Sequence, residues 1–342
     1  MTTHVALVGL GAAAQNLWLP AVKRTRGVTL VAGADPSPDA QRAFSALAPS
    51  CPTHPDLPTL LESHRSVDWV LVATPPRTHV AVATAALEAS RHVLCEKPLA
   101  GSVAAIDALA AVAERAGRTL AVNHELSRMR IFAATLARLR GSPPRFAHVW
   151  QTVATHTSPG WREAGDVLGE FGPHPIDLLI DAFGGSPAKA TARLPNPDGA
   201  AGTPVVLLTL EWPDGRAAHL TLDRMAPGRH RYLEARFDCA DACLRATFGG
   251  RADVRLGIDP RTRRPRVRWD LGPGGLAWVE RGQGREVYAR NPLNALADAT
   301  STLLAETLAG RPVGVSRARA VAAVIEAARR SAAEERTVAI GA

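Results

Sequence analysis

No apolar run in the 342-residue sequence approaches the roughly 18–20 residues that a membrane-spanning helix needs. The sequence starts with Met1-Thr-Thr-His-Val-Ala-Leu-Val. It lacks the basic segment and the long apolar segment of a signal peptide, so we expect a strand there. Cysteine is scarce too, and too rare for a disulfide scaffold; the four residues are Cys51, Cys95, Cys239 and Cys243. These absences predict a protein of the cytoplasm, a reducing compartment, without a membrane partner.

Several catalytic motifs are also missing. The sequence contains no serine nucleophile elbow and no phosphate-binding loop that ends in Lys-Ser or Lys-Thr. Cys239 and Cys243 lie close together, but no second pair and no histidine group lies near them. Tetrahedral zinc sites need such additional ligands. We therefore expect no metal site.

The chain carries a positive charge, with 40 Lys and Arg residues against 32 Asp and Glu residues and a formal net charge of +8. The basic residues are scattered, and the one dense group lies between Arg261 and Arg268. The alternation of Arg264, Arg266 and Arg268 is typical of a solvated face of a hairpin strand, so we expect no nucleic-acid partner. The charge leaves open an anionic small substrate, phosphorylated or nucleotide-linked.

Residues 1–120 alternate short apolar strands with alanine-rich helical stretches. The strands are predicted at Val5–Val8, Thr29–Ala34, Trp69–Ala73, His92–Cys95 and Thr119–Val122, with helices notably over Thr78–Ala89 and Val103–Arg115. Strands that are apolar throughout and separated by helices are buried on both faces of a parallel sheet. The pattern predicts a doubly wound Rossmann domain over residues 1–124.

After about residue 145, consecutive strands are joined by short turns, which favours an antiparallel or mixed sheet. The predicted strands are Arg145–Thr152, Val205–Trp212, Ala217–Leu222, Tyr232–Cys239, Cys243–Phe248, Arg266–Trp269 and Ala277–Arg281. Helices are predicted at Pro292–Ala309 and Arg317–Glu334. The fold class is therefore α/β, with a second α/β domain over 125–342 whose last helices can pack back on the first domain.

A glycine motif follows the first strand. Gly9, Gly11 and Ala14 form the pattern G-x-G-x-x-A before a helical stretch. In a Rossmann fold the first glycine makes the tight turn, the second lets the backbone approach a pyrophosphate, and the third position packs helix against strand. The helix start, with Ala12 and Ala13, then offers N–H groups to the phosphates. The alternative is a glycine-rich structural turn.

Asp35 ends the second strand, 21 residues after Ala14. A carboxylate at this position accepts hydrogen bonds from the adenosine ribose diol and repels a 2′-phosphate. The next residues, Pro36-Ser-Pro-Asp39, include no arginine. We therefore predict NAD as the cofactor, with NADP left open; a helix-capping role is the alternative for Asp35.

Two longer segments carry a resemblance to a known family. They are Ala73-Thr-Pro-Pro-Arg-Thr-His79 and Ala86-Leu-Glu-Ala-Ser-Arg-His-Val-Leu-Cys-Glu96-Lys97-Pro98-Leu99-Ala100. Further matches follow at Trp161-Arg162, at Glu170-Phe-Gly-Pro-His174-Pro-Ile-Asp177 and in the helix around 324–332. Through these segments the chain resembles the Gfo/Idh/MocA oxidoreductases, such as glucose-fructose oxidoreductase and inositol dehydrogenase, over nearly its whole length.

The resemblance implies a Rossmann domain followed by an α/β domain with a large, mostly antiparallel sheet. It places a small carbohydrate-like substrate between the nicotinamide and this sheet. Many members form dimers or tetramers through the outer face of the sheet, so we expect a homodimer or homotetramer.

The resemblance also assigns catalytic residues. Lys97, a cation beside the nicotinamide, is expected to hold a substrate hydroxyl, lower its pKa or relay its proton. Glu96 is expected to support the lysine or its turn; a Lys97–Glu96 pair of structural role is the alternative. His174 is expected to be the general acid and base, because an imidazole suits proton exchange at neutral pH. Glu170 stands where the family usually has Asp, and Asp177 is a substrate-binding candidate. If the segment is one helix, Glu170, His174 and Asp177 share a face.

The remaining candidates are less specific. Thr74, Pro75 and His79 match a turn and helix start near the cofactor in the family. His156, Trp161 and Arg162 are candidates for the substrate pocket, and His124 follows the last Rossmann strand. Before His174, Gly165-Asp166-Val167 replaces the family's usual glycine-rich run, so a different loop shape is expected.

The predicted function is hydride transfer between NAD(P) and a secondary alcohol or ketone of a sugar, cyclitol or nucleotide-linked sugar. Two alternatives stay open. One is an enzyme that withdraws hydride transiently while a glycosidic bond is cleaved. The other is a dinucleotide-binding regulatory protein without turnover.

Overall fold

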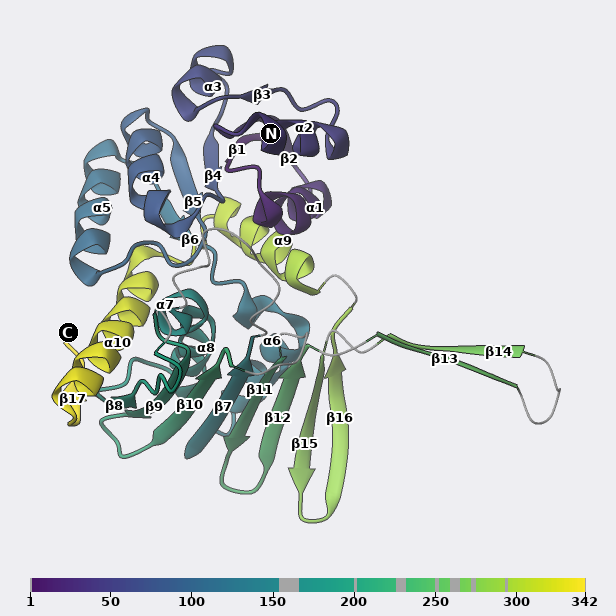
Figure 1. Cartoon of the computed structure of the whole chain (residues 1–342), viewed down its shortest axis with the longest axis vertical. Helices are drawn as coiled ribbons and strands as arrows, with labels where there is room; N and C mark the ends of the chain where they lie inside the picture. The colour runs from purple at the N-terminus through teal and green to yellow at the C-terminus, as the bar shows by residue number, and fades with distance from the viewer. Residues whose placement is uncertain are drawn as a thin grey trace. The chain divides into compact units, whose positions relative to one another are not determined.

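The structure, a computed structural model, describes residues 2–153, 166–199, 202–225, 232–249, 252–258, 265–271, 275–292 and 295–341. The chain divides into two compact units (Figure 1). The first unit comprises Met1–Arg128, Leu296–Glu326 and Gly341–Ala342, and the second comprises Met129–Ala295 and Ala327–Ile340. The helix α10 (Val315–Glu334) thus contributes residues to both units.

The first unit is built on a six-stranded parallel sheet with the order β3-β2-β1-β4-β5-β6. Its strands are β1 (Thr3–Val8), β2 (Val28–Ala34), β3 (Thr53–His54), β4 (Trp69–Val72), β5 (His92–Cys95) and β6 (Leu120–Val122). Every residue of the apolar strand β4 is buried, as expected for a sheet covered on both faces. This order is that of a doubly wound dinucleotide-binding fold, and it confirms the predicted fold class.

The helices of this unit begin at residues suited to that position. Ser37, Asp56 and Ser102 each accept a hydrogen bond from a backbone N–H in the first turn of the helix they precede. The helices between the strands are α1 (Leu19–Arg24), α2 (Pro38–Leu47), α3 (Leu57–Ser63), α4 (His79–Glu88) and α5 (Val103–Ala116). Short helical segments lie at Ala14–Trp18, Pro76–Thr78 and Leu126–Arg128.

The C-terminal part of the chain completes this first unit. Leu303 and Leu304 of α9 (Ala295–Leu308) are fully buried in its core. Beyond α9, the N–H of Val122 donates to the carbonyl of Val313, and Ala121 forms a bridge with Gly314. This segment therefore covers the edge of the parallel sheet at β6.

The second unit contains a nine-stranded sheet, the large sheet, with the order β16-β15-β12-β11-β7-β10-β9-β8-β17. Its paired strands are antiparallel except β7 and β10, which run parallel. The strands are β7 (Phe146–Thr152), β8 (Lys189–Arg193), β9 (Val205–Glu211), β10 (Ala217–Asp223), β11 (Tyr232–Asp238), β12 (Cys243–Phe248), β15 (Leu276–Arg281), β16 (Gly284–Arg290) and β17 (Val338–Ala339). The expected large, mostly antiparallel sheet is confirmed.

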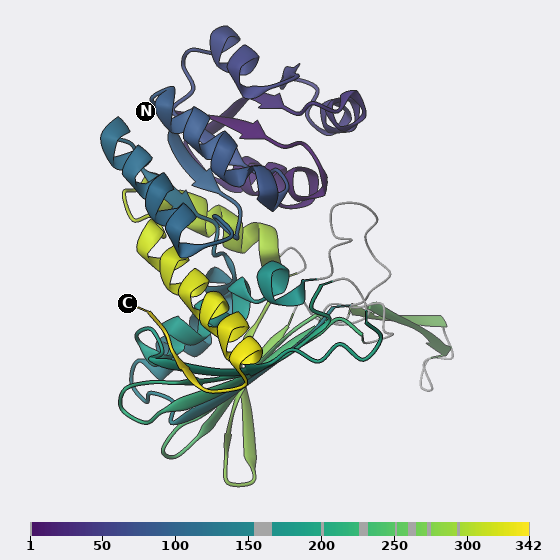
Figure 2. The same ribbon diagram turned by 60° about the vertical axis from the view of Figure 1, so that its left-hand side comes forward.

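Alternate residues of these strands are buried, so the large sheet has one covered face and one open face. The helices α6 (Arg130–Leu139), α7 (Val167–Phe171) and α8 (Pro173–Phe183) lie on the covered face (Figure 2). The helix α6 packs against β12, β15 and β16, while α7 packs against β9 and β10. Ten of the eleven residues of α8 are buried, which makes it the central helix of this layer.

The segment between β12 and β15 forms a hairpin of its own. The strands β13 (Ala252–Ile258) and β14 (Pro265–Leu271) pair antiparallel as a separate two-stranded sheet, although β12 and β15 pair directly. The predicted strand Arg266–Trp269 is confirmed within β14, whereas Arg264 lies outside the described residues. Within the described part of the chain, none of the helices combines the length and apolarity that crossing a bilayer demands.

Candidate active site

The glycine turn follows β1 at the point where the strand order of the parallel sheet reverses. Gly9 adopts a positive φ of 88°, which favours glycine. A Cβ atom on Gly9 would lie 2.7 Å from backbone atoms of Ala73 and Thr74, which follow β4. The turn is therefore close enough to its neighbour that only glycine fits. Dinucleotides bind in the crevice beside such a reversal.

The helical segment after this turn presents an open N-terminus. Gly11, Ala12 and Ala13 are exposed, and the position of a Cβ on Gly11 meets open space. Ala14 is fully buried, as the motif predicts for a helix packed close to its strand. The first N–H groups of a helix have no partners within the helix, so they are available to phosphate oxygens. The glycine turn and this exposed backbone fit a bound dinucleotide diphosphate.

Asp35 ties the second strand to the glycine turn. Its Oδ2 atom accepts the N–H of Leu10 at 2.8 Å, and its Oδ1 atom accepts the N–H of Ser37 at 2.8 Å. A carboxylate oxygen can accept more than one hydrogen bond, so both oxygens keep capacity for ribose hydroxyls. Asp35 is therefore fixed at the end of β2 with a geometry compatible with its predicted role.

Glu96 is a buried carboxylate that joins three segments of the first unit. Its Oε1 atom accepts hydrogen bonds from the indole N–H of Trp18 and from the side-chain amide of Asn123, both at 2.9 Å. Its Oε2 atom accepts the backbone N–H of Lys97 at 3.3 Å. Glu96 is 9% exposed. Its bonds connect the helix after β1 with the ends of β5 and β6 and fix the backbone from which Lys97 extends.

Trp18 lies in a π-helical turn that the sequence did not predict. In this turn the N–H of Leu19 donates to the carbonyl of Ala14, five residues earlier. The Trp18 side chain is fully buried. Trp18 and Asn123 are thus two members of the candidate site that motif analysis missed.

His79 joins the loops after β4 and β5. It is the first residue of α4, as predicted, and its side chain is fully buried. Its Nδ1 atom lies 2.8 Å from the carbonyl oxygen of Pro98, and its Nε2 atom lies 2.8 Å from that of Thr74. The Thr74 hydroxyl is buried and has no hydrogen-bond partner among the described residues, so it can bind a ligand atom. The carbonyl of the adjacent Pro75 accepts from Thr78.

His124, directly after β6, is buried with an Nδ1 atom that has no partner in the described chain. Burial lowers the pKa of His124, and together with the positive charges of Arg317, Lys97 and Arg128 it brings the pKa to about 3. The imidazole is therefore neutral at physiological pH. A proton carrier needs a pKa near the working pH, so His124 does not fit that role.

The helical segment around His174 is split into two helices. Glu170 lies in α7, whereas His174 and Asp177 lie in α8, which begins at Pro173 because proline has no N–H to continue the preceding helix. Pro173 and Pro175 both lie in the first turn of α8, where the missing N–H of proline is tolerated. Glu170 does not share one helix with His174 and Asp177, so the condition under which the three side chains would share a face is not met. His174 and Asp177, three residues apart, are both buried.

Glu170 instead pairs with a cation that sequence analysis missed. Its Oε2 atom lies 3.4 Å from Nη1 of Arg224, and the two side chains are 13% and 15% exposed. Arg224 directly follows β10, against which α7 packs. The second unit thus brings Glu170, His174, Asp177 and Arg224 to neighbouring turns of α7 and α8 and to one strand end.

Three predicted substrate-pocket residues, His156, Trp161 and Arg162, lie outside the described residues. Among the residues that are described, no group of three or more His, Cys, Asp and Glu side chains is arranged to hold a metal ion. The other predicted residues of the first unit follow the carboxyl ends of β1, β2, β4 and β5, at one edge of the parallel sheet. They are Gly9, Gly11, Ala12, Ala13, Asp35, Thr74, Pro75, His79, Glu96 and Lys97.

Two family models match the chain. The model described as "Oxidoreductase family, NAD-binding Rossmann fold" matches residues 3–124, and the model described as "GFO/IDH/MocA C-terminal domain" matches residues 133–244. The first match spans the parallel sheet and the second begins in α6.

Curated relatives match over part of their length. A protein of Amycolatopsis mediterranei with the provisional name UDP-kanosamine synthase oxidoreductase subunit is 34% identical over 193 residues, which are 54% of this chain and 52% of that protein. Inositol 2-dehydrogenase 1 of Saccharopolyspora erythraea is 39% identical over 105 residues, 30% of this chain and 31% of that protein. The chain therefore spans about half of the first relative and less of the second.

A solved structure shares the whole fold. The oxidoreductase from Agrobacterium radiobacter, crystallised with NAD+, L-tartaric acid and magnesium, superposes with a TM-score of 0.81 at 18% identity. The superposition covers 100% of this chain and 99% of that one. The two family models identify the chain as a member of the GFO/IDH/MocA oxidoreductase family with an NAD-binding Rossmann domain.

Proposed function

We propose that this protein is a dehydrogenase or ketoreductase that transfers a hydride between NAD and a secondary alcohol of a sugar, a cyclitol or a nucleotide-linked sugar. The observation that carries the proposal is the set of three hydrogen bonds that Glu96 accepts. These bonds fix the backbone of Lys97 at the cofactor edge of the parallel sheet. A backbone fixed by hydrogen bonds restricts where the Lys97 side chain can reach. Catalysis requires that a reacting group is held in such a defined position.

When NAD is bound, its nicotinamide would supply the hydride acceptor or donor. Lys97 holds the substrate oxygen and stabilises the negative charge that grows on it when its proton leaves. His174 takes this proton, or returns it in the reverse direction. Asp177, His156, Trp161 and Arg162 are the proposed substrate-binding residues.

Glu170 binds the substrate or positions the His174 imidazole, the role that the resemblance gives to the family's aspartate at this position. The Arg224 ion pair supports this assignment, because it holds a side chain that is one methylene longer in a defined place.

The names of two relatives support the substrate class: one refers to a nucleotide-linked amino sugar and the other to a cyclitol. Both substrates carry several hydroxyl groups on a ring. The preference for NAD over NADP rests on Asp35, whose carboxylate would repel a 2′-phosphate. The cytoplasm remains the proposed compartment, in accord with the four free thiols.

A screen of sugars, cyclitols and sugar nucleotides, followed through the absorbance of reduced nicotinamide with NAD and with NADP, tests this function. We expect net oxidation of at least one secondary alcohol. Product formation without a net change in nicotinamide would favour transient hydride transfer instead. NAD binding without turnover of any compound would contradict an enzyme and favour a regulatory protein.

We further propose that the open face of the large sheet forms a homodimer or homotetramer. Phe146, Trp150, Leu207 and Val287, four of the five large apolar side chains exposed in the described chain, lie on this face. Monomers seldom expose such a set of apolar side chains.

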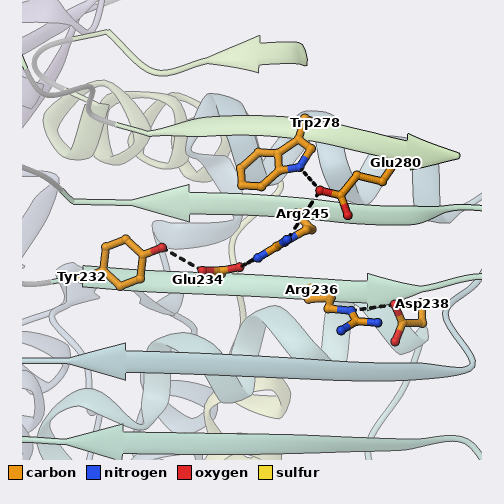
Figure 3. Close-up of polar contacts among 7 residues, drawn as sticks. All are labelled: Tyr232, Glu234, Arg236, Asp238, Arg245, Trp278 and Glu280. Atoms are coloured by element: carbon orange, nitrogen blue, oxygen red, sulfur yellow. Dashed lines mark hydrogen bonds and ion pairs between the residues drawn. The ribbon is translucent and has the colours of Figure 1, made fainter. Parts of the chain in front are cut away.

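A polar network on β11, β12 and β15 lies on the same open face (Figure 3). The Tyr232 hydroxyl donates to Glu234, Arg245 pairs with Glu234 and Glu280, and the indole N–H of Trp278 donates to Glu280. A face ordered in this way suits association with a second copy, since its charges are already paired. Sedimentation of the wild type should give a dimer or tetramer, and Trp150→Glu should shift it to a smaller species. A monomeric wild type would contradict this proposal.

A further inference from the structure

Gln151 is a buried amide with unsatisfied polar atoms on the central strand β7. Its exposed fraction is 0%. Neither its Oε1 atom nor its Nε2 atom has a hydrogen-bond partner among the described residues. Both polar ends of the amide therefore lack a hydrogen bond within the described chain.

The surroundings of Gln151 in the sheet are apolar. Its cross-strand neighbours are Leu222 on β10 and Leu233 on β11, both fully buried. Ala147 and Val149, on the same face of β7, are fully buried as well. These neighbours provide no side-chain donor or acceptor for the amide.

Gln151 lies at the same end of the large sheet as the Glu170–Arg224 pair. The strands β7 and β10 run parallel, with Gln151 opposite Leu222 and Thr152 opposite Asp223. Arg224 is the next residue of that chain segment, and it reaches Glu170 on α7. Because α7 packs against β9 and β10 on the covered face, Gln151 faces the layer that carries Glu170.

An unpaired amide in such a setting destabilises the folded protein, because it leaves its bonds to water and gains none. A leucine or methionine would fill the same place without this penalty. Unsatisfied polar groups that a protein keeps are often the groups that a ligand completes. The amide offers an acceptor oxygen and a nitrogen with two donor hydrogens. The oxygen and the nitrogen lie about 2.2 Å apart in one plane, a spacing suited to two adjacent oxygen atoms of a ligand.

We propose that Gln151 is a substrate-binding residue that recognises a vicinal diol of the sugar or cyclitol ring. Its Oε1 atom accepts the hydrogen of one hydroxyl, and its Nε2 atom donates to the oxygen of the next. This inference rests on the proposed function for the identity of the ligand. It adds a residue that selects polyols over simple alcohols.

The test compares Gln151→Met with Gln151→Asn and the control Thr152→Val in the full-length, NAD-loaded protein. Thr152 is the adjacent residue and faces the other side of the sheet, so its nearly isosteric change controls for effects on the strand. The probes are myo-inositol, glucose and UDP-glucose, each with a deoxy analogue. Their affinities are measured by calorimetry, and Tm is measured with and without each probe.

We expect Gln151→Met to keep or raise the Tm of the probe-free protein and to weaken binding of the best probe about 10-fold or more. The deoxy analogue that lacks the recognised hydroxyl should then bind the wild type and Gln151→Met equally. Gln151→Asn keeps an amide but shortens its reach, so it should also weaken binding. This variant replaces Gln151→Met in the comparison if Gln151→Met does not fold. Thr152→Val should bind like the wild type.

Unchanged probe affinity in the Gln151 variants would overturn the inference and assign the amide to an internal water molecule. Equal weakening for the probe and for all its deoxy analogues would overturn it as well. Because calorimetry needs no turnover, a wild type that binds a probe without oxidising it would contradict the proposed function and still test Gln151.

Discussion

Two buried polar side chains at strand ends, Glu96 in the first unit and Gln151 in the second, differ in how they are satisfied. Glu96 accepts hydrogen bonds from Trp18, Asn123 and the backbone of Lys97. Gln151 has no partner within the described chain. Glu96 therefore belongs to the scaffold that orients the cofactor edge. The Gln151 amide, in our proposal, gains its hydrogen bonds only when the substrate binds.

The difference teaches that the candidate residues of the two units are prepared for their ligands to different degrees. The cofactor half is fixed by bonds within the first unit, including those of His79 and Asp35. A fixed half suits one constant ligand, the dinucleotide. The substrate half keeps polar groups that need a ligand, and this arrangement allows one fold to serve different substrates.

The largest expected effect is on chemistry. Changing His174 or Lys97 to Ala should lower kcat about 10²-fold or more, because proton transfer and charge stabilisation at the substrate oxygen are lost. The Kd for NAD should stay near that of the wild type for His174→Ala. Steady-state kinetics and calorimetry check both, with His64→Ala as the matched control. Turnover like that of the wild type in both variants would remove these residues from the mechanism.

A change of Glu96 should affect stability. Glu96→Ala leaves the Trp18 indole and the Asn123 amide without their acceptor, and the free energy of unfolding should fall by about 2–3 kcal/mol. Glu96→Gln keeps one side-chain carbonyl and should lose less. Urea unfolding of the three proteins checks this order. An unfolding free energy of Glu96→Ala equal to that of the wild type would refute the scaffold role of Glu96.

Asp35→Ser should change cofactor choice. Removal of the carboxylate weakens the ribose contact and relieves the repulsion of a 2′-phosphate, so the ratio of kcat/KM for NAD to that for NADP should fall about 10-fold. Kinetics with both cofactors at one ionic strength measure the ratio. An unchanged ratio would show that Asp35 does not read the ribose.

The last expected effect concerns pH and is confined to acid. The pKa of His124 is about 3 in the folded protein, and its ordinary value is 6.5. Between these values the unfolded chain binds a proton that the folded chain does not, so acid destabilises the fold by up to about 1.4 kcal/mol per pH unit from this residue. His124→Asn should show a shallower loss of stability between pH 6 and pH 4 by about this slope. Equal slopes would contradict a buried neutral imidazole.

The two halves of the site also differ in what the sequence could predict. Gly9, Asp35, His79 and Lys97 lie in short motifs whose spacing is set by strand and helix lengths, so their place at one sheet edge follows from the pattern. The start of α8 was predictable from Pro173 and Pro175 in the same way.

Side-chain partners from distant segments were not predictable. Trp18 is 78 residues from Glu96, and Arg224 is 54 residues from Glu170. No local signal connects them, because such pairs depend on how elements pack and not on their order along the chain. Gln151 stands in an alternating strand, where its side chain is distinguished only by the absence of a partner in three dimensions.

The most direct test of the mechanism is a crystal structure of the protein with NAD and its best substrate. We expect Lys97 Nζ and a ring nitrogen of His174 each to lie about 3 Å from the same substrate oxygen, on the carbon that faces the nicotinamide. A substrate oxygen that contacts only one of these two groups, or neither, would contradict the account.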